Sequence, residues 1–346
     1  MLADDVVFVV GVDTHSETHT LALLDTRTQR TRQNVTIPAT RRGYWQALRL
    51  ARRQAPGKRA WALEGSGSYG AGLARFLRER GEQVLEVERP AREGSRGRLK
   101  SDALDAERAA RAVLSGTSGS APRLGCETQA LRALLVAREG AVQACTAALN
   151  QLHALLVTAP PELRERLQGH TRTALLERCS RLRPGTADWE RAALALALRS
   201  LARRVHQLQT EADTLEQELT RRIQTLAPEL LARPGVGPIS AAALLIAWSH
   251  PGRLRHEAAF ARLAGAAPIP ANSGKTHRHR LDRGGDRRLN RALHTIALTR
   301  RRIDEDTKRY IARRVSEGKT EREAVRCLKR YLARSLYRQM EAMPTT

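Results

Sequence analysis

Short apolar runs separated by turn residues dominate the beginning of the chain. Residues 6–13, 18–25 and 31–38 each read as one strand, and the turns between them are short enough for hairpins. We therefore expect an antiparallel meander of three strands.

The pattern then alternates between helix and strand. Residues 41–54 and 68–81 place apolar side chains at helical spacing, whereas residues 58–65 and 82–88 read as strands. Three linked strands followed by alternating helix and strand predict a mixed sheet of five strands flanked by helices. This is the order of a ribonuclease H-like fold, so the predicted class is α/β for this part of the chain and α for the rest.

The middle of the chain contains two long segments with apolar residues at helical spacing. Residues 127–157 and 187–227 keep apolar positions three and four apart, and a connection containing proline and arginine separates them. We expect a helical coiled-coil arm that acts as a packing or dimerising spacer. The predicted domains are residues 1–120, 121–227 and 228–346.

The last part of the chain reads as mostly helical. Residues 230–248 predict a helix, a tight turn containing Gly235 and Gly237, and a second helix. This order resembles a helix-hairpin-helix element, whose turn offers backbone N–H groups to a phosphate. A plain helical hairpin would give the same pattern. Residues 283–302 and 321–340 predict basic helices.

The excess of basic residues indicates which class of molecule the protein binds. The chain has 60 Lys+Arg against 36 Asp+Glu, a formal net charge of +24, which indicates a polyanion such as nucleic acid. Aromatic residues make up only 3%, which disfavours a stacking platform for single strands. Four scattered cysteines without a C-x-x-C pair indicate neither zinc nor disulfides. Apolar runs too short for a bilayer and an N-terminus without a basic region favour the cytoplasm.

Four acidic residues stand where a metal site requires them. Asp13 ends the first predicted strand and Glu64 ends the fourth, while Asp102 and Asp105 share one face of a helix predicted over residues 99–113. Singly, these acids fit a turn or a helix dipole. Together they supply hard oxygen ligands for one or two Mg²⁺ ions that clamp a phosphate.

Ser273 lies in the segment PANSGKTHRHR, residues 270–280. The letters SGKT suggest a phosphate-binding P-loop, but that motif needs a glycine at position 269, where the chain has Ile269. From the residues alone, a serine before a glycine is a turn former.

Several motifs, in order along the chain, are similar to those of one family. VGVDTHSETHTLALLD, WALEGSGSYG, LKSDALDAERAARAV, RPGVGPISAAALLIAW, FARLAGAAPIPANSGKTHRHRLDRGGDRRLNRALHTIAL and EGKTEREAVRCLKRYLAR resemble the insertion sequence 110 family of transposases, which are DEDD serine recombinases guided by a bridge RNA. The resemblance implies a RuvC-like domain, a coiled-coil arm and a C-terminal transposase domain.

The resemblance also implies the site residues. Matched motif by motif, the four metal-binding and catalytic acids fall on Asp13, Glu64, Asp102 and Asp105, and the nucleophile falls on Ser273. The expected nucleic-acid contacts are Arg96, Arg98, Lys100, Gly235, Gly237, Lys275, Arg278, Arg280, Arg287, Arg288 and Arg291.

The implied reaction is metal-assisted attack of Ser273 on a DNA phosphodiester, giving a phosphoserine ester that a DNA 3′-hydroxyl later reverses. The implied partners are donor DNA, target DNA and a structured bridge RNA that provides sequence specificity by base pairing. A homodimer or tetramer is expected, with acids of one subunit serving the serine of another. Such an enzyme would act on the nucleoid of a bacterial cytoplasm.

Two other functions compete with this one. A RuvC-like junction endonuclease would use the same acids with water, leave Ser273 structural and release free DNA ends. A packaging protein would need none of the acids. Acids in so basic a chain weaken phosphate binding unless a metal screens them, which disfavours packaging.

Overall fold

The computed structural model describes residues 5–87, 101–116, 119–122, 126–185, 188–270, 279–280, 282 and 284–343. The chain folds as two compact units. Unit 1 comprises Met1–Gly125, Trp248–His256 and Thr345–Thr346, and unit 2 comprises Cys126–Ala247 and Glu257–Pro344.

Unit 1 contains the predicted mixed sheet. Its strands are β1 (Phe8–Thr14), β2 (Thr18–Asp25), β3 (Thr31–Pro38), β4 (Arg59–Glu64) and β5 (Gln83–Val87). The order across the sheet is β3-β2-β1-β4-β5. β1, β2 and β3 pair antiparallel, whereas β4 lies parallel to both β1 and β5. The five strands expected from the sequence are confirmed, and their arrangement fits a ribonuclease H-like fold.

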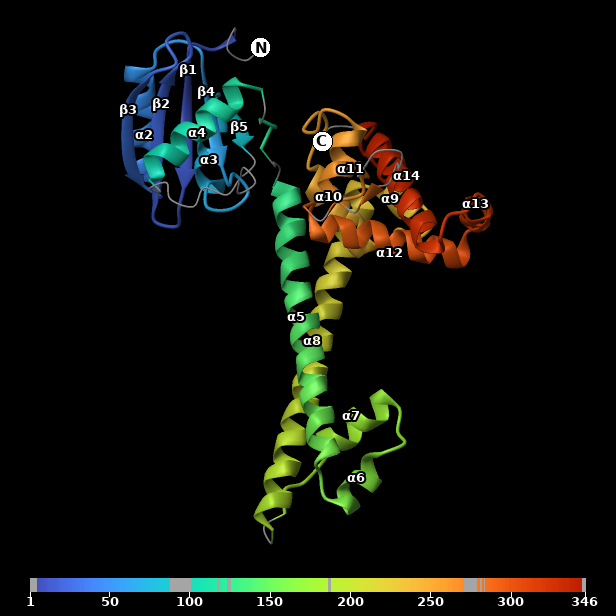
Figure 1. Ribbon diagram of the computed structural model, residues 1–346. Helices are drawn as coiled ribbons and strands as arrows, with labels where there is room; N and C mark the ends of the chain where they lie inside the picture. The colour runs from blue at the N-terminus through green and yellow to red at the C-terminus, as the bar shows by residue number, and fades with distance from the viewer. Residues whose placement is uncertain are drawn as a thin grey trace. The chain divides into compact units, whose positions relative to one another are not determined.

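Helices cover both faces of this sheet. α2 (Arg41–Gln54) and α3 (Ala71–Arg78) pack on the face to which Val10 and Val12 point. α4 (Asp102–Leu114) packs on the opposite face, against Val9 and its neighbours, and Figure 1 shows it crossing the sheet. This division follows from the strand, in which successive side chains point to opposite faces.

Unit 2 is helical. The long helices α5 (Cys126–Val157) and α8 (Trp189–Leu226) lie side by side, as Figure 1 shows. An ion pair of 2.8 Å between Arg138 and Glu216 joins the two helices. The connection between them, in which the sequence showed only proline and arginine, contains α6 (Pro161–Leu167) and α7 (Arg172–Ser180). They fold because their leucines join an apolar cluster with α5 and α8.

The rest of unit 2 contains α9 (Pro228–Leu231), α10 (Pro238–Trp248), α11 (Glu257–Leu263), α12 (Arg287–Ile303), α13 (Glu305–Ser316) and α14 (Glu321–Glu341). The short strands β6 (Ile269–Pro270) and β7 (His279–Arg280) pair antiparallel. Trp248, at the end of α10, is assigned to unit 1. None of the described helices has the length and apolar character needed to cross a membrane.

Candidate functional site

Two of the predicted acids occupy neighbouring strand ends. β1 and β4 run parallel with Val12 opposite Leu63, so the next residues, Asp13 and Glu64, reach the same edge of the sheet. Asp13 is only 8% exposed. A buried carboxylate is costly unless a cation or hydrogen-bond donors compensate its charge.

α4 brings the third acid to the same edge. The side chain of Ser101 caps this helix by accepting a hydrogen bond from the N–H of Leu104, so the helix begins at Asp102. Gly11 lets α4 approach β1 closely, because a Cβ there would lie 1.9 Å from the carbonyl oxygen of Ala106. Ala106 lies one helical turn after Asp102 on α4. Gly11 and Asp13 are two residues apart on β1 and therefore point to the same face of the sheet.

A histidine completes the group. Nε2 of His15 lies 3.1 Å from Oδ2 of Asp13 and 3.7 Å from Oδ1 of Asp102. Among the described residues, these three side chains form a group whose ligand atoms all lie within 4.8 Å of one another. His15 was not among the residues predicted from the sequence, although its place two residues after Asp13 was a usable signal. Two carboxylates and an imidazole are a suitable donor set for a divalent cation.

The other two acids are not members of this group. The main-chain oxygen of Glu64 accepts a hydrogen bond of 2.8 Å from the Thr14 hydroxyl, and its side chain is partly exposed at the strand end. Asp105 accepts a hydrogen bond of 2.6 Å from Nη1 of Arg108, which lies one turn further along α4. The structure thus joins Asp13 to Asp102, whereas Asp105 pairs with an arginine.

The second histidine of the same motif has a packing environment. His19 is fully buried on β2, and its ring stacks on Tyr44 of α2 at a centroid distance of 5.8 Å. Burial is the main cause that lowers the pKa of His19 below its ordinary value, so a neutral ring is favoured. His19 is therefore a core residue of unit 1.

Part of the expected site lies outside the described residues. This applies to Ser273, Lys275 and Arg278, and also to Arg96, Arg98 and Lys100. The paired strands β6 and β7 stand immediately before and after residues 271–278, with Ile269 opposite Arg280.

The remaining basic candidates differ in their contacts. Arg280 and Arg287 are exposed. Nη2 of Arg288 lies 2.6 Å from the Glu139 carboxylate of α5, and Arg291 is 3.7 Å from the same carboxylate. Arg288 thus has an internal partner, so part of its charge is compensated within the protein.

The two turn glycines also differ. Gly235 has a φ of +79°, and a Cβ there would lie 3.0 Å from the carbonyl oxygen of Ile296 on α12. A Cβ at Gly237 would have open space around it. Packing against α12 is therefore sufficient reason for glycine at position 235.

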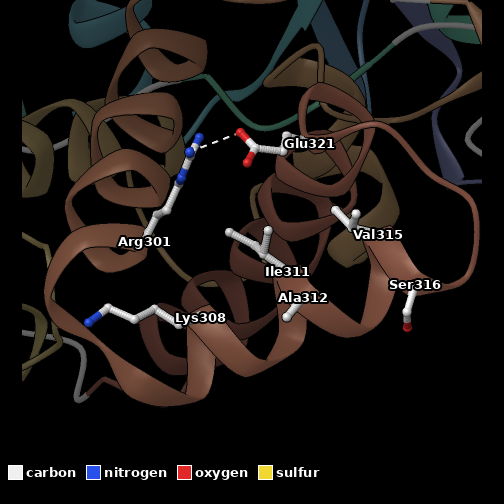
Figure 2. A pocket seen from close by; sticks show the side chains of 7 residues that line it. All are labelled: Arg301, Lys308, Ile311, Ala312, Val315, Ser316 and Glu321. Carbon is white, nitrogen blue, oxygen red and sulfur yellow. Dashed lines mark ion pairs between the residues drawn. The ribbon is translucent and has the colours of Figure 1, made fainter.

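A separate hollow lies among α12, α13 and α14. Figure 2 shows its lining side chains: Arg301 and Glu321 point toward each other, and the apolar side chains of Ile311, Ala312 and Val315 also line the hollow. Its single acid, Glu321, pairs with Arg301 at 2.9 Å. With one acid already paired, the hollow offers no set of metal ligands comparable with that of unit 1.

Comparison with known proteins agrees with this arrangement. A family model of the IS110 DEDD type, described as "Transposase", matches residues 10–161. A second model, described as "Transposase IS116/IS110/IS902 family", matches residues 227–312. The first match contains all four predicted acids and the second contains Ser273.

Two curated relatives are similar over less than half of the chain. The "Insertion element IS110 uncharacterized 43.6 kDa protein" of Streptomyces coelicolor is 30% identical over 145 residues, covering 41% of this chain and 35% of the relative. The "Insertion element IS900 uncharacterized 42 kDa protein" of Mycobacterium paratuberculosis is 36% identical over 143 residues, covering 39% of this chain and 35% of the relative. The chain thus spans about a third of the length of these relatives. The two family models name the same group and match successive parts of a chain with the expected sheet, so over residues 10–161 and 227–312 the chain matches the IS110 family of transposases.

Proposed function

We propose that this protein is a DNA transposase of an insertion sequence and joins donor to target DNA. The observation that supports this most is the meeting of Asp13 and Asp102 at one edge of the sheet, from segments far apart in the sequence. A buried aspartate beside a second carboxylate is the arrangement expected of a centre that holds a divalent cation against a phosphate.

The proposed chemistry uses Ser273 as the nucleophile. The serine hydroxyl releases its proton as Oγ attacks the scissile phosphorus, the bond from phosphorus to the 3′ oxygen breaks, and the 3′ oxygen takes up a proton and leaves as a hydroxyl. The energy of the phosphodiester is kept in the phosphoserine ester, which another DNA 3′-hydroxyl can attack. One or two Mg²⁺ ions, when bound, supply positive charge beside the phosphate.

Asp13 and Asp102 are the proposed ligands best supported by geometry, because their carboxylates already lie together. Glu64 and Asp105 remain proposed ligands of the same centre. Asp105 would have to exchange its contact with Arg108 for the cation.

The proposed partners are donor DNA, target DNA and a structured bridge RNA. The net charge of +24 supports polyanionic partners. The proposed organisation is a RuvC-like domain over residues 1–120, an arm over 121–227 and a transposase domain with a helix-hairpin-helix-like turn over 228–346. A homodimer or tetramer would let the acids of one protomer serve Ser273 of another.

A covalent protein–DNA product tests this function. The full chain is incubated with Mg²⁺, labelled donor and target DNA, and RNA transcribed from the flanking sequence of the element, and the products are separated on a denaturing gel. We expect a DNA-linked protein band that is lost in Ser273→Ala, in Asp102→Ala and with a chelator. Ser316→Ala is the matched control, because Ser316 is exposed and, among the described residues, its hydroxyl bonds only to its own helix.

The competing endonuclease gives a different result. Cleavage that requires Asp102 but leaves no linked protein, and that is unchanged in Ser273→Ala, would mean that water is the nucleophile. Joining that persists in Asp13→Ala and Asp102→Ala would exclude a metal-dependent reaction at this site.

A further inference from the structure

We propose that His15 is a direct nitrogen ligand of the metal centre formed with Asp13 and Asp102. The centre would then take a divalent first-row transition metal such as Mn²⁺ in addition to Mg²⁺. This inference rests on the proposed metal-dependent function of the same site and adds a residue and a class of cation to it.

The distances suit a single cation. In octahedral coordination at about 2.1 Å, adjacent ligand atoms lie roughly 3 Å apart. Nε2 of His15 lies 3.1 Å from the Asp13 carboxylate and 3.7 Å from that of Asp102. Small rotations would place all three atoms on neighbouring corners of one coordination sphere.

The exposure of two of the three side chains supports these rotations. The side chains of His15 and Asp102 are 50% and 61% exposed, so packing does not hold either of them rigidly. Asp13 is the fixed member, since its side chain is 12% exposed and β1 lies inside the sheet. The fixed, buried carboxylate thus anchors the centre and the two exposed side chains close around the cation.

The contacts of Asp13 also favour its role as a metal ligand. Within the described part of the chain, Nε2 of His15 is the one group in hydrogen-bond contact with the Asp13 side chain. A carboxylate whose side chain is 12% exposed needs more compensation than one hydrogen bond from a half-exposed ring. A cation reached by Nε2 and both carboxylates would provide it.

The ligand set has a consequence for metal preference. Carboxylate oxygens suit Mg²⁺ and Mn²⁺ alike, whereas an imidazole nitrogen favours transition metals over Mg²⁺. Loss of the imidazole should therefore reduce Mn²⁺ affinity more than Mg²⁺ affinity. We expect about a tenfold or greater loss for Mn²⁺, the size typical of perturbing a metal site.

The test uses Mn²⁺ as the probe and the full chain without nucleic acid. Electron spin-echo spectra of the Mn²⁺ complex report directly bound nitrogen, and ¹⁵N-labelling of histidine in the unsubstituted protein identifies that nitrogen as imidazole. Calorimetry gives the affinities for Mn²⁺ and Mg²⁺. His15→Gln removes the imidazole, and His153→Gln is the matched control, because His153 is exposed on α5 in the other unit.

A histidine nitrogen bound to Mn²⁺ that is lost in His15→Gln and retained in His153→Gln would establish the proposal. Mn²⁺ bound through oxygen alone, with affinity lost in Asp13→Ala but unchanged in His15→Gln, would overturn it and leave the metal-dependent function standing. If the unsubstituted chain binds neither Mn²⁺ nor Mg²⁺, the proposed metal-dependent function fails as well. The labelled, unsubstituted protein answers the question even if His15→Gln does not fold.

Discussion

Gly11 affects the geometry of the candidate metal centre because it has no side chain. It is the point on β1 where α4 comes closest, and the carbonyl of Ala106 occupies the space where a Cβ would be. Asp13 follows two residues later and Asp102 lies one turn before Ala106. The distance between the two carboxylates therefore depends on how closely α4 packs against β1.

Gly11→Ala should displace α4 and separate Asp102 from Asp13. Because a methyl group 1.9 Å from a carbonyl oxygen cannot be accommodated, we expect a loss of about 1–3 kcal/mol in the free energy of unfolding, or more if the backbone cannot shift. Mn²⁺ affinity should fall with it. Denaturant unfolding and calorimetry measure the two effects.

Gly140→Ala is the matched control in α5. A Cβ at Gly140 would meet nothing within 4 Å, so alanine should stabilise this helix by about 0.5–1 kcal/mol and leave metal binding unchanged. If Gly11→Ala folds and binds Mn²⁺ as Gly140→Ala does, close packing of α4 does not position the acids.

At the level of elements, a buried ion pair joins β4 to the start of β5. Glu82 accepts hydrogen bonds from Arg59 at 2.6 and 2.8 Å and from the Trp61 indole at 3.0 Å, and its side chain is 6% exposed. Burial acts to raise the pKa of Glu82, but the hydrogen bonds and positive charges outweigh it and the pKa is lowered. This pair ties the outer strand β5 to the sheet.

Glu82→Ala should destabilise unit 1 by about 3–5 kcal/mol at neutral pH, because it leaves Arg59 buried without its partner. The folded pKa lies below the ordinary value of 4.5, so this stabilisation is present above that value and is lost as the pH falls through the folded pKa. The difference in the free energy of unfolding between the unsubstituted protein and Glu82→Ala should therefore become smaller in acid. Denaturant unfolding across this pH range measures it.

Glu79→Ala provides the comparison for Glu82→Ala. The side chain of Glu79 is 61% exposed and lies 3.4 Å from Arg80, so its removal should change stability by less than about 1 kcal/mol. Equal losses in the two variants would show that burial of Glu82 is not the source of its effect.

Considered as a single polyelectrolyte, the chain carries its excess charge almost entirely on arginine, since only six of its 60 basic residues are lysines. Some guanidinium groups are compensated internally. Arg288 pairs with Glu139 and Arg32 with Asp25, whereas Arg287 is exposed near the start of α12. Exposed arginines for which the described residues supply no acidic partner, such as Arg287, are therefore the ones expected to contact phosphates.

Nucleic-acid affinity should fall steeply with salt. A protein that contacts about 6–10 phosphates loses roughly 10³–10⁵ in affinity between 50 and 200 mM salt. Anisotropy titrations with labelled RNA and DNA measure the slope. Arg287→Ala should reduce the slope of log affinity against log salt concentration by about 1. Arg32→Ala should leave this slope unchanged, because the guanidinium of Arg32 already pairs with Asp25. An affinity independent of salt would contradict binding through phosphates.

Local patterns were sufficient for the strands of the five-stranded sheet and most of the longer helices. Strands, helices and the acids at their ends could be read from the sequence, because burial imposes a period on neighbouring residues and turns follow from local backbone chemistry. The same reasoning located Asp13 at the end of β1 and Asp102 in the first turn of α4. It missed the short helices α6 and α7, which depend on leucine contacts with α5 and α8.

The membership of the metal group required the folded chain. Asp13 and Asp102 are far apart in sequence, and their meeting depends on the docking of α4 at Gly11, which no local period encodes. His15 reaches Asp102 for the same reason, whereas Asp105 pairs with Arg108 within α4 itself. A sequence indicates which side chains can bind a metal, but their positions are set by contacts between distant elements.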